Sequence, residues 1–437
     1  MLFRSVGDLD YVVRAAIASE PDRTANVFSL GPRVMVAVES LRETGLLQPG
    51  SLVRWLYRVA LDDPGAAPGF VEDLKRRFPS AGWRIRTLAD AAPGLQRWVD
   101  RIAMFLGLVG LTALLVGGVV EQDLYSLGGE ALVLVYPKTE GKVVSVVGQG
   151  WAPAGATIDW YTSRGKTLNG KGLDPAVIPG ALHAALTVLE RWGTMSFEEV
   201  AARAIEYAER GFPLRPRTAN AIRNQLKFIE QWPENRAYWL KADGSQYKPG
   251  DTLKFPTLAN TLKRMVAAER DAKSKGRNAG IVAARDRFYK GDIAQEMVAF
   301  LKQNGAPFEL PDFAEFYAKV EAPAVTTYRG YEVYKHGFGS QGPALLEALN
   351  ILENFDLKAM KLNSADYLHT IVEALKLAYA DRDTYYADPD FVQVPAEGLL
   401  SKAYAKQRAK LIDAKRANPT FVAGDPLPFD SKVKEWK

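Results

Sequence analysis

The sequence predicts a mixed α/β (α+β) fold, and three observations lead to this class. Residues 328–334, Tyr-Arg-Gly-Tyr-Glu-Val-Tyr, are rich in aromatic and β-branched side chains and predict a strand. A glycine-rich turn over 337–342 follows. Pro343 then opens a predicted helix over 344–354, because proline at the first helical position sacrifices no hydrogen bond. An apolar run over 102–120 predicts a helix of a different kind.

The composition is that of a folded protein of two or three domains. The chain has 437 residues, 47% of them hydrophobic and 24% charged, which is ordinary for globular proteins. The net charge of +5 is small, and the densest basic run, 263–287, also contains acids, which predicts a solvated helical face and no nucleic-acid partner. The absence of cysteine excludes disulfides, thiolate nucleophiles and zinc–thiolate sites but leaves the cellular compartment unknown. The first residues, 1–8, have the composition of a folded domain and not of a signal peptide, so we expect no signal peptide.

Residues 1–100 predict a small α/β domain. The segments 34–38 and 53–59 are strand-like, and the second alternates with a period of two. Residues 70–78 predict a short helix with Phe70, Val71 and Leu74 facing inward.

The run over 102–120 has no charged residue and lies between Arg101 and Glu121. As a helix it would be about 28 Å long, close to the roughly 30 Å thickness of a bilayer's hydrocarbon core. Eleven of its side chains are Ile, Leu, Val or Phe, so membrane insertion would be favoured by roughly 5 kcal/mol before the cost of its glycines. The run is therefore a candidate transmembrane span, and a buried core helix is the alternative.

Several elements are predicted in the remainder, 121–437. A glycine turn leads into a strand over 127–136, and 142–147 is its expected hairpin partner. The segment 178–182 opens a helix with Leu182, Leu186 and Leu189 on one face. Residues 196–199, Ser-Phe-Glu-Glu, form a predicted capping box whose helix ends at Gly211. A further helix follows the N-cap pair Asn363-Ser364. One of its faces is expected to be core and carries Leu368, Ile371, Val372, Leu375 and Tyr379.

The glycine turn over 337–342 also matches a nucleotide-binding pattern. Its glycines spell G-x-G-x-x-G between a strand and a helix, and Asp356 lies at a suitable distance downstream. That acid should end a second strand, for which 351–356 leaves no room. We therefore favour a tight turn that packs a helix on a sheet, and a nucleotide-binding enzyme remains an alternative.

The residues alone give no independent active site. His183, His336 and His369 are scattered, and no metal-binding spacing is present, so we predict neither a metal nor a cofactor. Ser340 lies in a glycine turn, but Phe338 stands where a nucleophile elbow needs glycine. No residue of the chain is therefore predicted to be catalytic.

Most of residues 119–437 consists of sequence segments that also occur, in the same order, in a known protein family. The segments resemble the large subunit of γ-glutamyltranspeptidases, notably Tyr-Arg-Gly-Tyr-Glu-Val-Tyr (328–334), Asn-Ser-Ala-Asp-Tyr-Leu-His (363–369) and Ala-Tyr-Ala-Asp-Arg (378–382). Further blocks lie at 127–136, 149–153, 178–182, 190–194, 209–213, 247–251, 288–294, 349–357 and 398–402.

The resemblance implies an incomplete αββα sandwich of the N-terminal-nucleophile hydrolases. In that family a precursor cleaves itself, and the threonine that begins the small subunit attacks the γ-glutamyl amide with its own amino group as base. The chain's last residues, 435–437, precede any such threonine, and Thr326-Thr327 leads into a large-subunit strand instead. We therefore expect a glutathione hydrolase-like amidohydrolase or acyltransferase that is inactive without a small-subunit partner.

Gln149 is the one predicted substrate-binding residue. It stands where the family has the arginine of an Arg-Glu-x-Ala-Pro motif, which pairs with the α-carboxylate of the glutamyl group. A neutral amide cannot form that pair, and the loss of about 1.5–3 kcal/mol would weaken binding tenfold or more. The acyl substrate is therefore open. The alternative is that Gln149 only holds the turn before Pro153.

The first part of the chain resembles a different family. Segments 31–36, 47–54 and 105–118 are similar to an FtsX-like ABC transporter permease, which implies a periplasmic domain and the start of a membrane helix. We therefore expect a fusion or truncation product with a permease-like domain over 1–100, an apolar helix over 101–120 and a transpeptidase-like domain over 121–437. Its location would be periplasmic or at the inner membrane through 102–120. A membrane-anchored binding protein is the alternative function.

Overall fold

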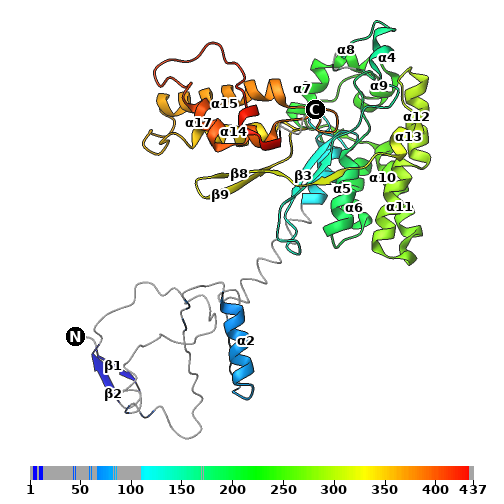
Figure 1. Cartoon of the computed structure of the whole chain (residues 1–437). Helices are drawn as coiled ribbons and strands as arrows, with labels where there is room; N and C mark the ends of the chain where they lie inside the picture. The colour runs from blue at the N-terminus through cyan, green and yellow to red at the C-terminus, as the bar shows by residue number, and fades with distance from the viewer. Residues whose placement is uncertain are drawn as a thin grey trace. The chain divides into compact units, whose positions relative to one another are not determined.

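The computed structural model describes residues 3–6, 9–12, 43, 45, 59, 61, 66–81, 83, 85, 110–168, 170 and 172–432. The chain divides into two compact units, Met1–Phe105 and Leu106–Lys437. In the first, β1 (Phe3–Val6) and β2 (Leu9–Val12) form an antiparallel hairpin that the sequence analysis does not predict. Helix α2 (Ala67–Arg77) confirms the short predicted helix (Figure 1). The predicted strands at 34–38 and 53–59 lie outside the described residues, apart from Val59.

The second half of the candidate membrane span is a helix of the second unit. Residues 110–120 are helical, whereas 102–109 lie outside the described part of the chain. Leu115 and Val119 are 2% and 0% exposed and belong to the main hydrophobic core, and Leu111, Val116 and Val120 pack against that core. Within the residues that the structure describes, no helix has the length and apolar character needed to cross a membrane.

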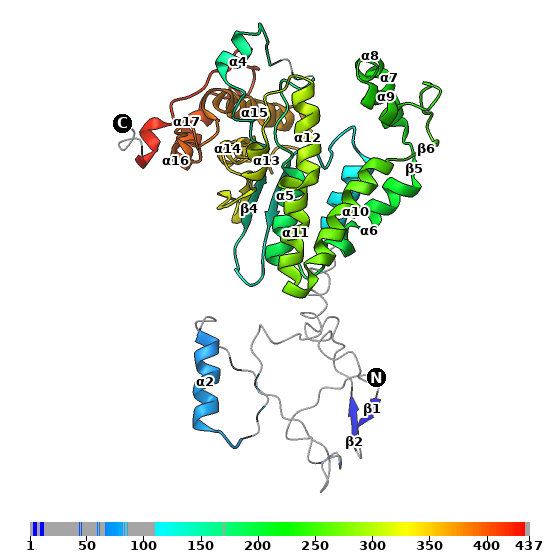
Figure 2. The ribbon, with the colours of Figure 1, turned by 90° about the vertical axis from the view of Figure 1, so that its right-hand side faces the viewer.

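Most of the second unit's core lies among long helices, which Figure 2 shows side by side. Their bounds are α5 (Ala181–Trp192), α6 (Phe197–Arg210), α10 (Pro256–Asp271), α11 (Arg277–Tyr289) and α12 (Asp292–Gln303). Leu182, Leu186 and Leu189 of α5 are at most 2% exposed, and the capping box of Ser196 and Glu199 begins α6, so both predictions are confirmed.

Shorter elements connect these helices. They are α4 (Ile158–Thr162), α7 (Pro216–Asn224), α8 (Leu226–Ile229), α9 (Pro233–Trp239), the 3₁₀ turn Lys273–Lys275 and α13 (Leu310–Ala314). Strands β5 (Phe212–Pro213) and β6 (Thr252–Leu253) form a small ladder beside α6 and α10.

A three-stranded antiparallel sheet lies against α5. It consists of β3 (Ala131–Val135), β4 (Val144–Gly148) and β7 (Lys319–Glu321), with β4 in the centre. The predicted hairpin of 127–136 with 142–147 is confirmed, with Ala131 opposite Gly148 and Val135 opposite Val144. Val147 of β4 lies opposite Lys319 of β7.

The strand predicted over 328–334 is confirmed for 331–334, whereas Tyr328 ends a preceding strand and Arg329-Gly330 form a turn between the two. Strand β8 (Ala324–Tyr328) pairs antiparallel with β9 (Tyr331–Lys335), and a two-residue turn of Arg329 and Gly330 joins them. Both turn residues have positive φ, 49° and 87°, as a type I′ turn requires. An arginine in this conformation masks the turn from sequence rules that look for Asn-Gly or Asp-Gly.

Three helices form the part of the unit that contains the β8–β9 hairpin. In Figure 1 this part lies to the left of α5 and α6. The three helices are α14 (Pro343–Leu352), with Pro343 in its first turn as predicted, α15 (Ala365–Tyr385) and α17 (Lys402–Ala409). The short α16 (Ala396–Leu399) and a 3₁₀ turn, Leu427–Phe429, complete this part.

Helix α15 begins as predicted, because the Ser364 side chain accepts from the backbone N–H of Tyr367. Its predicted core face is only partly confirmed: Ile371 packs against a core cluster and Leu375 is half-buried, but the other three residues are exposed. Leu368, Val372 and Tyr379 are 49%, 51% and 42% exposed. The buried face instead carries Thr370, Glu373, Ala374, Leu377, Ala378, Ala380 and Asp381.

Candidate functional site

Gln149 lies directly after β4, at the end of the central strand of the sheet. Alternate residues of a strand point to opposite faces. On the face toward α5, Val146 is fully buried and packs with Ala184, Val188 and Ala318. Gln149 belongs by this alternation to the opposite face, which we call the open face. Its paired members are Leu132, Leu134, Ser145, Val147, Lys319 and Glu321. Continuing the alternation beyond the strand ends adds Glu130, Tyr136, Gln149 and Tyr317 to this face.

The open face exposes large apolar side chains. Leu132 and Leu134 of β3 are 38% and 37% exposed, and Tyr136 just beyond the strand is 64% exposed. Their neighbours Ala131, Val133 and Val135, which point toward α5, pack against its core cluster. One face of this sheet is therefore covered by a helix layer. The other face exposes Leu132, Leu134 and Tyr136 along β3 but is covered at Ser145 of β4, which is 0% exposed and lies beside His336.

Glycines allow the backbone around Gln149 to pack closely against residues 178–180, which precede α5. A Cβ on Gly150 would lie 1.9 Å from the carbonyl oxygen of Ile178, and one on Gly180 would lie 2.2 Å from that of Gly148. The backbone N–H of Ile178 donates to the Trp151 carbonyl at 2.9 Å. The close approach of two backbones, which only glycine permits, thus sets the position of Gln149.

Substitution of Gly150 by alanine is expected to lower the free energy of unfolding by about 1–3 kcal/mol, because a backbone oxygen must move to admit the methyl group. Gly128→Ala is the matched control, since the nearest atom to its added Cβ is 3.7 Å away. Urea denaturation of both variants measures the difference. Equal stability of the two variants would contradict the close packing at Gly150.

The electrostatic surroundings of Gln149 include a carboxylate. Continuing the β3–β4 register by one residue places Gln149 opposite Glu130, which is exposed. Glu130 Oε1 accepts from the Gly150 N–H at 3.1 Å. A negative group thus lies beside the position where the family resemblance leads us to expect a cationic one.

An aromatic cluster adjoins Gln149 on the open face. Continuing the β4–β7 register places Tyr317 opposite Gln149. The Trp151 ring makes edge contacts with Tyr317 at 5.1 Å and with Phe316 at 5.4 Å between ring centroids. Trp151 and Tyr317 are 37% and 53% exposed, whereas Phe316 is 4% exposed. A buried ring thus supports two accessible ones.

The three histidines have structural partners and do not meet. His183 is buried, its Nδ1 accepts from the Ala318 N–H at 3.1 Å, and burial lowers its pKa to about 3. His369 Nε2 donates to the Asp413 carbonyl at 2.7 Å. The part of the chain that the structure describes holds no cluster of three His, Asp or Glu side chains suited to a metal.

The structure pairs His336 with Ser145, a contact that sequence reasoning missed because 191 positions separate the two. Ser145 Oγ lies 2.9 Å from His336 Nδ1. Ser145 is 0% exposed and His336 is 9% exposed, and burial lowers the pKa of the histidine. No substrate reaches this hydroxyl, so the pair joins β4 to the end of β9 and is not a nucleophile with its base.

The glycine turn is a local structural device. Ser340 donates to the Gly337 carbonyl at 2.9 Å and accepts from the Gly342 N–H at 3.1 Å. The strand before it is half of an antiparallel hairpin, and Asp356 accepts from the backbone N–H groups of Lys358 and Ala359. A dinucleotide site needs a parallel βαβ unit with an acid ending its second strand, and this arrangement does not supply one.

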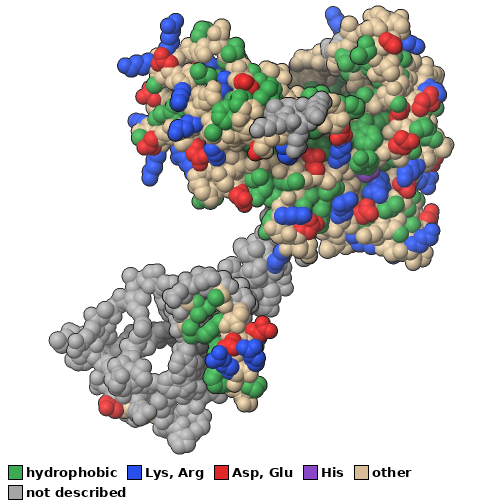
Figure 3. Space-filling model, viewed as in Figure 1, with side chains coloured by type: hydrophobic (Ala, Val, Ile, Leu, Met, Phe, Trp, Pro, Cys, Tyr) green, Lys and Arg blue, Asp and Glu red, His purple; other side chains and the backbone are tan. Residues whose placement is uncertain are grey.

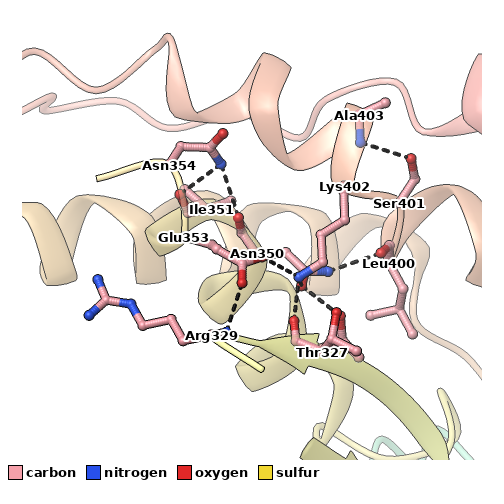
Figure 4. A network of polar contacts seen from close by, with 11 residues as sticks. Thr327, Arg329, Asn350, Ile351, Glu353, Asn354, Leu400, Ser401, Lys402 and Ala403 are labelled. Carbon is pink, nitrogen blue, oxygen red and sulfur yellow. Dashed lines mark hydrogen bonds and ion pairs between the residues drawn. The ribbon is translucent and has the colours of Figure 1, made fainter. Parts of the chain in front are cut away.

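A polar network joins the hairpin β8–β9 to α14 and α17 (Figure 4). Lys402 Nζ donates to Asn350 Oδ1 at 2.7 Å, to Glu353 Oε2 at 2.6 Å and to the Thr327 carbonyl. Glu353 Oε1 accepts from the Arg329 N–H at 2.8 Å and thereby holds the turn. Hydrogen bonding to Lys402 lowers the pKa of Glu353. These groups satisfy one another, so the network positions elements and offers no reacting group.

A buried charged cluster lies among α14, α15 and α17 and was not predicted. Asp381 and Arg408, 0% and 3% exposed, form an ion pair at 3.1 Å. Asp381 also accepts from Tyr404 Oη at 2.9 Å and from the Gly424 N–H at 2.8 Å. Burial nevertheless raises the pKa of Asp381. Glu347 lies 2% exposed in the same cluster.

Several basic residues of α10 are paired with acids of neighbouring helices. Lys263 contacts Glu209 at 2.5 Å, and Arg264 contacts Glu296 at 2.9 Å. On the face that Figure 3 shows, blue and red side chains alternate over the second unit without a patch of one sign. This arrangement matches the expected solvated helical faces.

Comparison with known proteins identifies relatives over most of the second unit. The family model described as Gamma-glutamyltranspeptidase matches residues 110–435. The chain is 33% identical over 296 residues to the glutathione hydrolase-like YwrD proenzyme of Bacillus subtilis, a match that covers 67% of this chain and 53% of that protein. It is 31% identical over 296 residues to the acylase ACY 1 proenzyme of Pseudomonas sp. strain SE83, covering 65% and 50%.

A solved structure shows the same likeness in three dimensions. The γ-glutamyltranspeptidase of Helicobacter pylori matches with a TM-score of 0.65 and 25% identity, over 76% of this chain and 90% of that one. The chain spans about half the length of the curated relatives that it matches.

Proposed function

The chain belongs to the γ-glutamyltranspeptidase family, and from this premise we propose that its second unit is the large-subunit half of an N-terminal-nucleophile enzyme. The reaction would be hydrolysis or transfer of an acyl group held in an amide. A small subunit that begins with threonine would complete the enzyme.

The position of Gln149 carries this proposal. The side chain lies at the end of the central strand, on the open face, with backbone contacts at Gly150 and Gly180 that fix it there. A donor–acceptor amide at this place can bind the acyl part of a substrate through hydrogen bonds. Because Gln149 is neutral and Glu130 lies beside it, a free α-carboxylate is disfavoured.

The chemistry would be divided between the two subunits. The threonine Oγ would attack the acyl carbonyl, its amino group would take the hydroxyl proton, and that proton would pass to the departing amine. Water or an acceptor amine would then release the acyl group from the resulting ester. This chain would contribute substrate orientation and the sheet against which the reacting subunit packs.

The exposed apolar side chains of the open face support a small subunit as the partner. The exposed Leu132, Leu134 and Tyr136 lie on one side of a sheet whose other side α5 already covers. A second sheet packed there would bury these side chains at a spacing of about 10 Å, as in a sandwich of two sheets between two helix layers.

Assays with the p-nitroanilides of several acyl groups test the proposed function. The chain alone is expected to release no nitroaniline, whereas its complex with a threonine-led small subunit of the family should release it. Replacing that threonine by alanine in the complex is the control and should abolish release. Hydrolysis by the purified chain alone, or none by the complex with any acyl group, would contradict the proposal.

The permease resemblance of residues 1–118 remains a prediction, as do the domain limits 1–100, 101–120 and 121–437. Sequencing the source DNA across the codons near Val119 tests the expected fusion. A continuous reading frame through this region supports one chain, whereas two separate frames would mean that the parts belong to different genes.

A further inference from the structure

We propose that Trp151 and Tyr317 form an acyl-binding shelf that selects amides of aromatic or other uncharged apolar acids. This inference rests on the proposed function and specifies its substrate class. It concerns the rings beside Gln149 rather than the position of Gln149 itself.

The shelf is placed beside Gln149 by two independent features of the backbone. Trp151 follows Gln149 by two residues, just beyond the end of β4, and its backbone carbonyl accepts from the Ile178 N–H at 2.9 Å. Tyr317 reaches the same place through the β4–β7 register, and its ring contact with Trp151 at 5.1 Å agrees with that register. The three residues therefore lie at the same end of the sheet.

Buried aromatic side chains support the exposed ring of Trp151. Phe316 is buried and contacts the Trp151 ring at 5.4 Å, and it also contacts His183 at 5.4 Å and Tyr289 at 5.8 Å. Tyr289 is 1% exposed and donates to the Pro179 carbonyl at 2.5 Å. A rigid aromatic surface of this kind binds a flat apolar group at a low cost in side-chain entropy.

The polar groups at the shelf disfavour an anionic acyl group. Gln149 supplies a neutral amide, and the nearby Glu130 carboxylate would repel a second carboxylate. Lys319, the cation on the same face of β7, already pairs with Asp390. An uncharged acyl chain that ends in a ring fits both the contact surface and the charge.

Ligand-observed NMR on the full chain tests the shelf without catalysis, with phenylacetamide and L-glutamine as probes. Saturation transfer to the phenylacetamide ring is expected, with weaker transfer to L-glutamine. Trp151→Ala should weaken phenylacetamide binding by about fivefold to tenfold, whereas Trp151→Phe should retain most of it. Trp83→Ala is the matched control, because Trp83 is 57% exposed and lies in the other unit.

Gln149→Arg provides the reciprocal test and should raise the affinity for L-glutamine by about tenfold or more. The shelf is overturned if phenylacetamide binding is unchanged in Trp151→Ala, or if the unaltered chain binds L-glutamine more tightly. Either result concerns binding alone. The proposed function is tested separately by the anilide assay, and an inactive two-subunit complex would contradict it.

Discussion

Replacement of Asp381 by alanine is expected to lower the free energy of unfolding by about 3–5 kcal/mol at neutral pH. The variant leaves the guanidinium of Arg408, only 3% exposed, without its carboxylate partner. The Gly424 N–H and the Tyr404 hydroxyl lose their acceptor as well. Urea denaturation at pH 7 measures the loss.

Asp383→Ala is the matched control for this substitution. Asp383 lies two residues further along α15 and pairs with Arg382, but its side chain is 62% exposed. Exposed pairs of this kind contribute at most about 1 kcal/mol. A loss at Asp381 no greater than that at Asp383 would contradict the buried ion pair.

Replacement of Glu347 by glutamine is expected to make stability less dependent on pH. Burial raises the pKa of Glu347 well above its ordinary value of 4.5, its Oε1 accepts from Tyr386 at 2.5 Å, and its Oε2 is buried without a partner. The folded chain therefore holds this proton more firmly than the unfolded chain. Its contribution to stability is present below about pH 4.5 and is lost as pH rises toward the raised pKa, by up to about 1.4 kcal/mol per pH unit.

Denaturation of the parent chain and the Glu347→Gln variant at pH 5 and pH 8 measures this dependence. The variant should gain stability relative to the parent chain at the higher pH. Glu353→Gln is the contrasting control: Lys402 lowers the pKa of Glu353, so its contribution is present above its ordinary pKa and lost as pH falls. An identical pH profile for Glu347→Gln and the parent chain would contradict a raised pKa.

The elements that the sequence predicted correctly have signals within a few residues of one another. The capping box at Ser196, the leucine face of α5 and Pro343 at the start of α14 depend on local spacing. Each imposes its geometry through contacts one helical turn apart, so no distant part of the chain needs to be known.

The core face of α15 differs from the prediction because distant residues decide which of its side chains are buried. The buried face of α15 carries Glu373 and Asp381, whose partners Lys376, Arg408 and the Gly424 N–H satisfy their charges. Hydrophobicity alone therefore misplaces part of the core face of this helix. Helical spacing of apolar residues selects Leu368, Val372 and Tyr379, which are exposed.

The candidate site was only partly predictable for the same reason. Gln149 was found through a motif, but its neighbours Glu130 and Tyr317 follow from strand register, and Tyr317 lies 168 positions away in the sequence. The aromatic signal was present at Trp151 and at Phe316-Tyr317. No sequence rule joins these two segments without the pairing of β4 with β7.

Hydroxyl-radical footprinting of the chain with and without a threonine-led small subunit of the family tests whether that subunit packs on the open face. Leu132, Leu134 and Tyr136 on the open face are expected to react in the isolated chain and to be protected in the complex, while Trp83 reacts equally in both. Protection of Leu368, Val372 and Tyr379 on α15, with the open face still reactive, would contradict it.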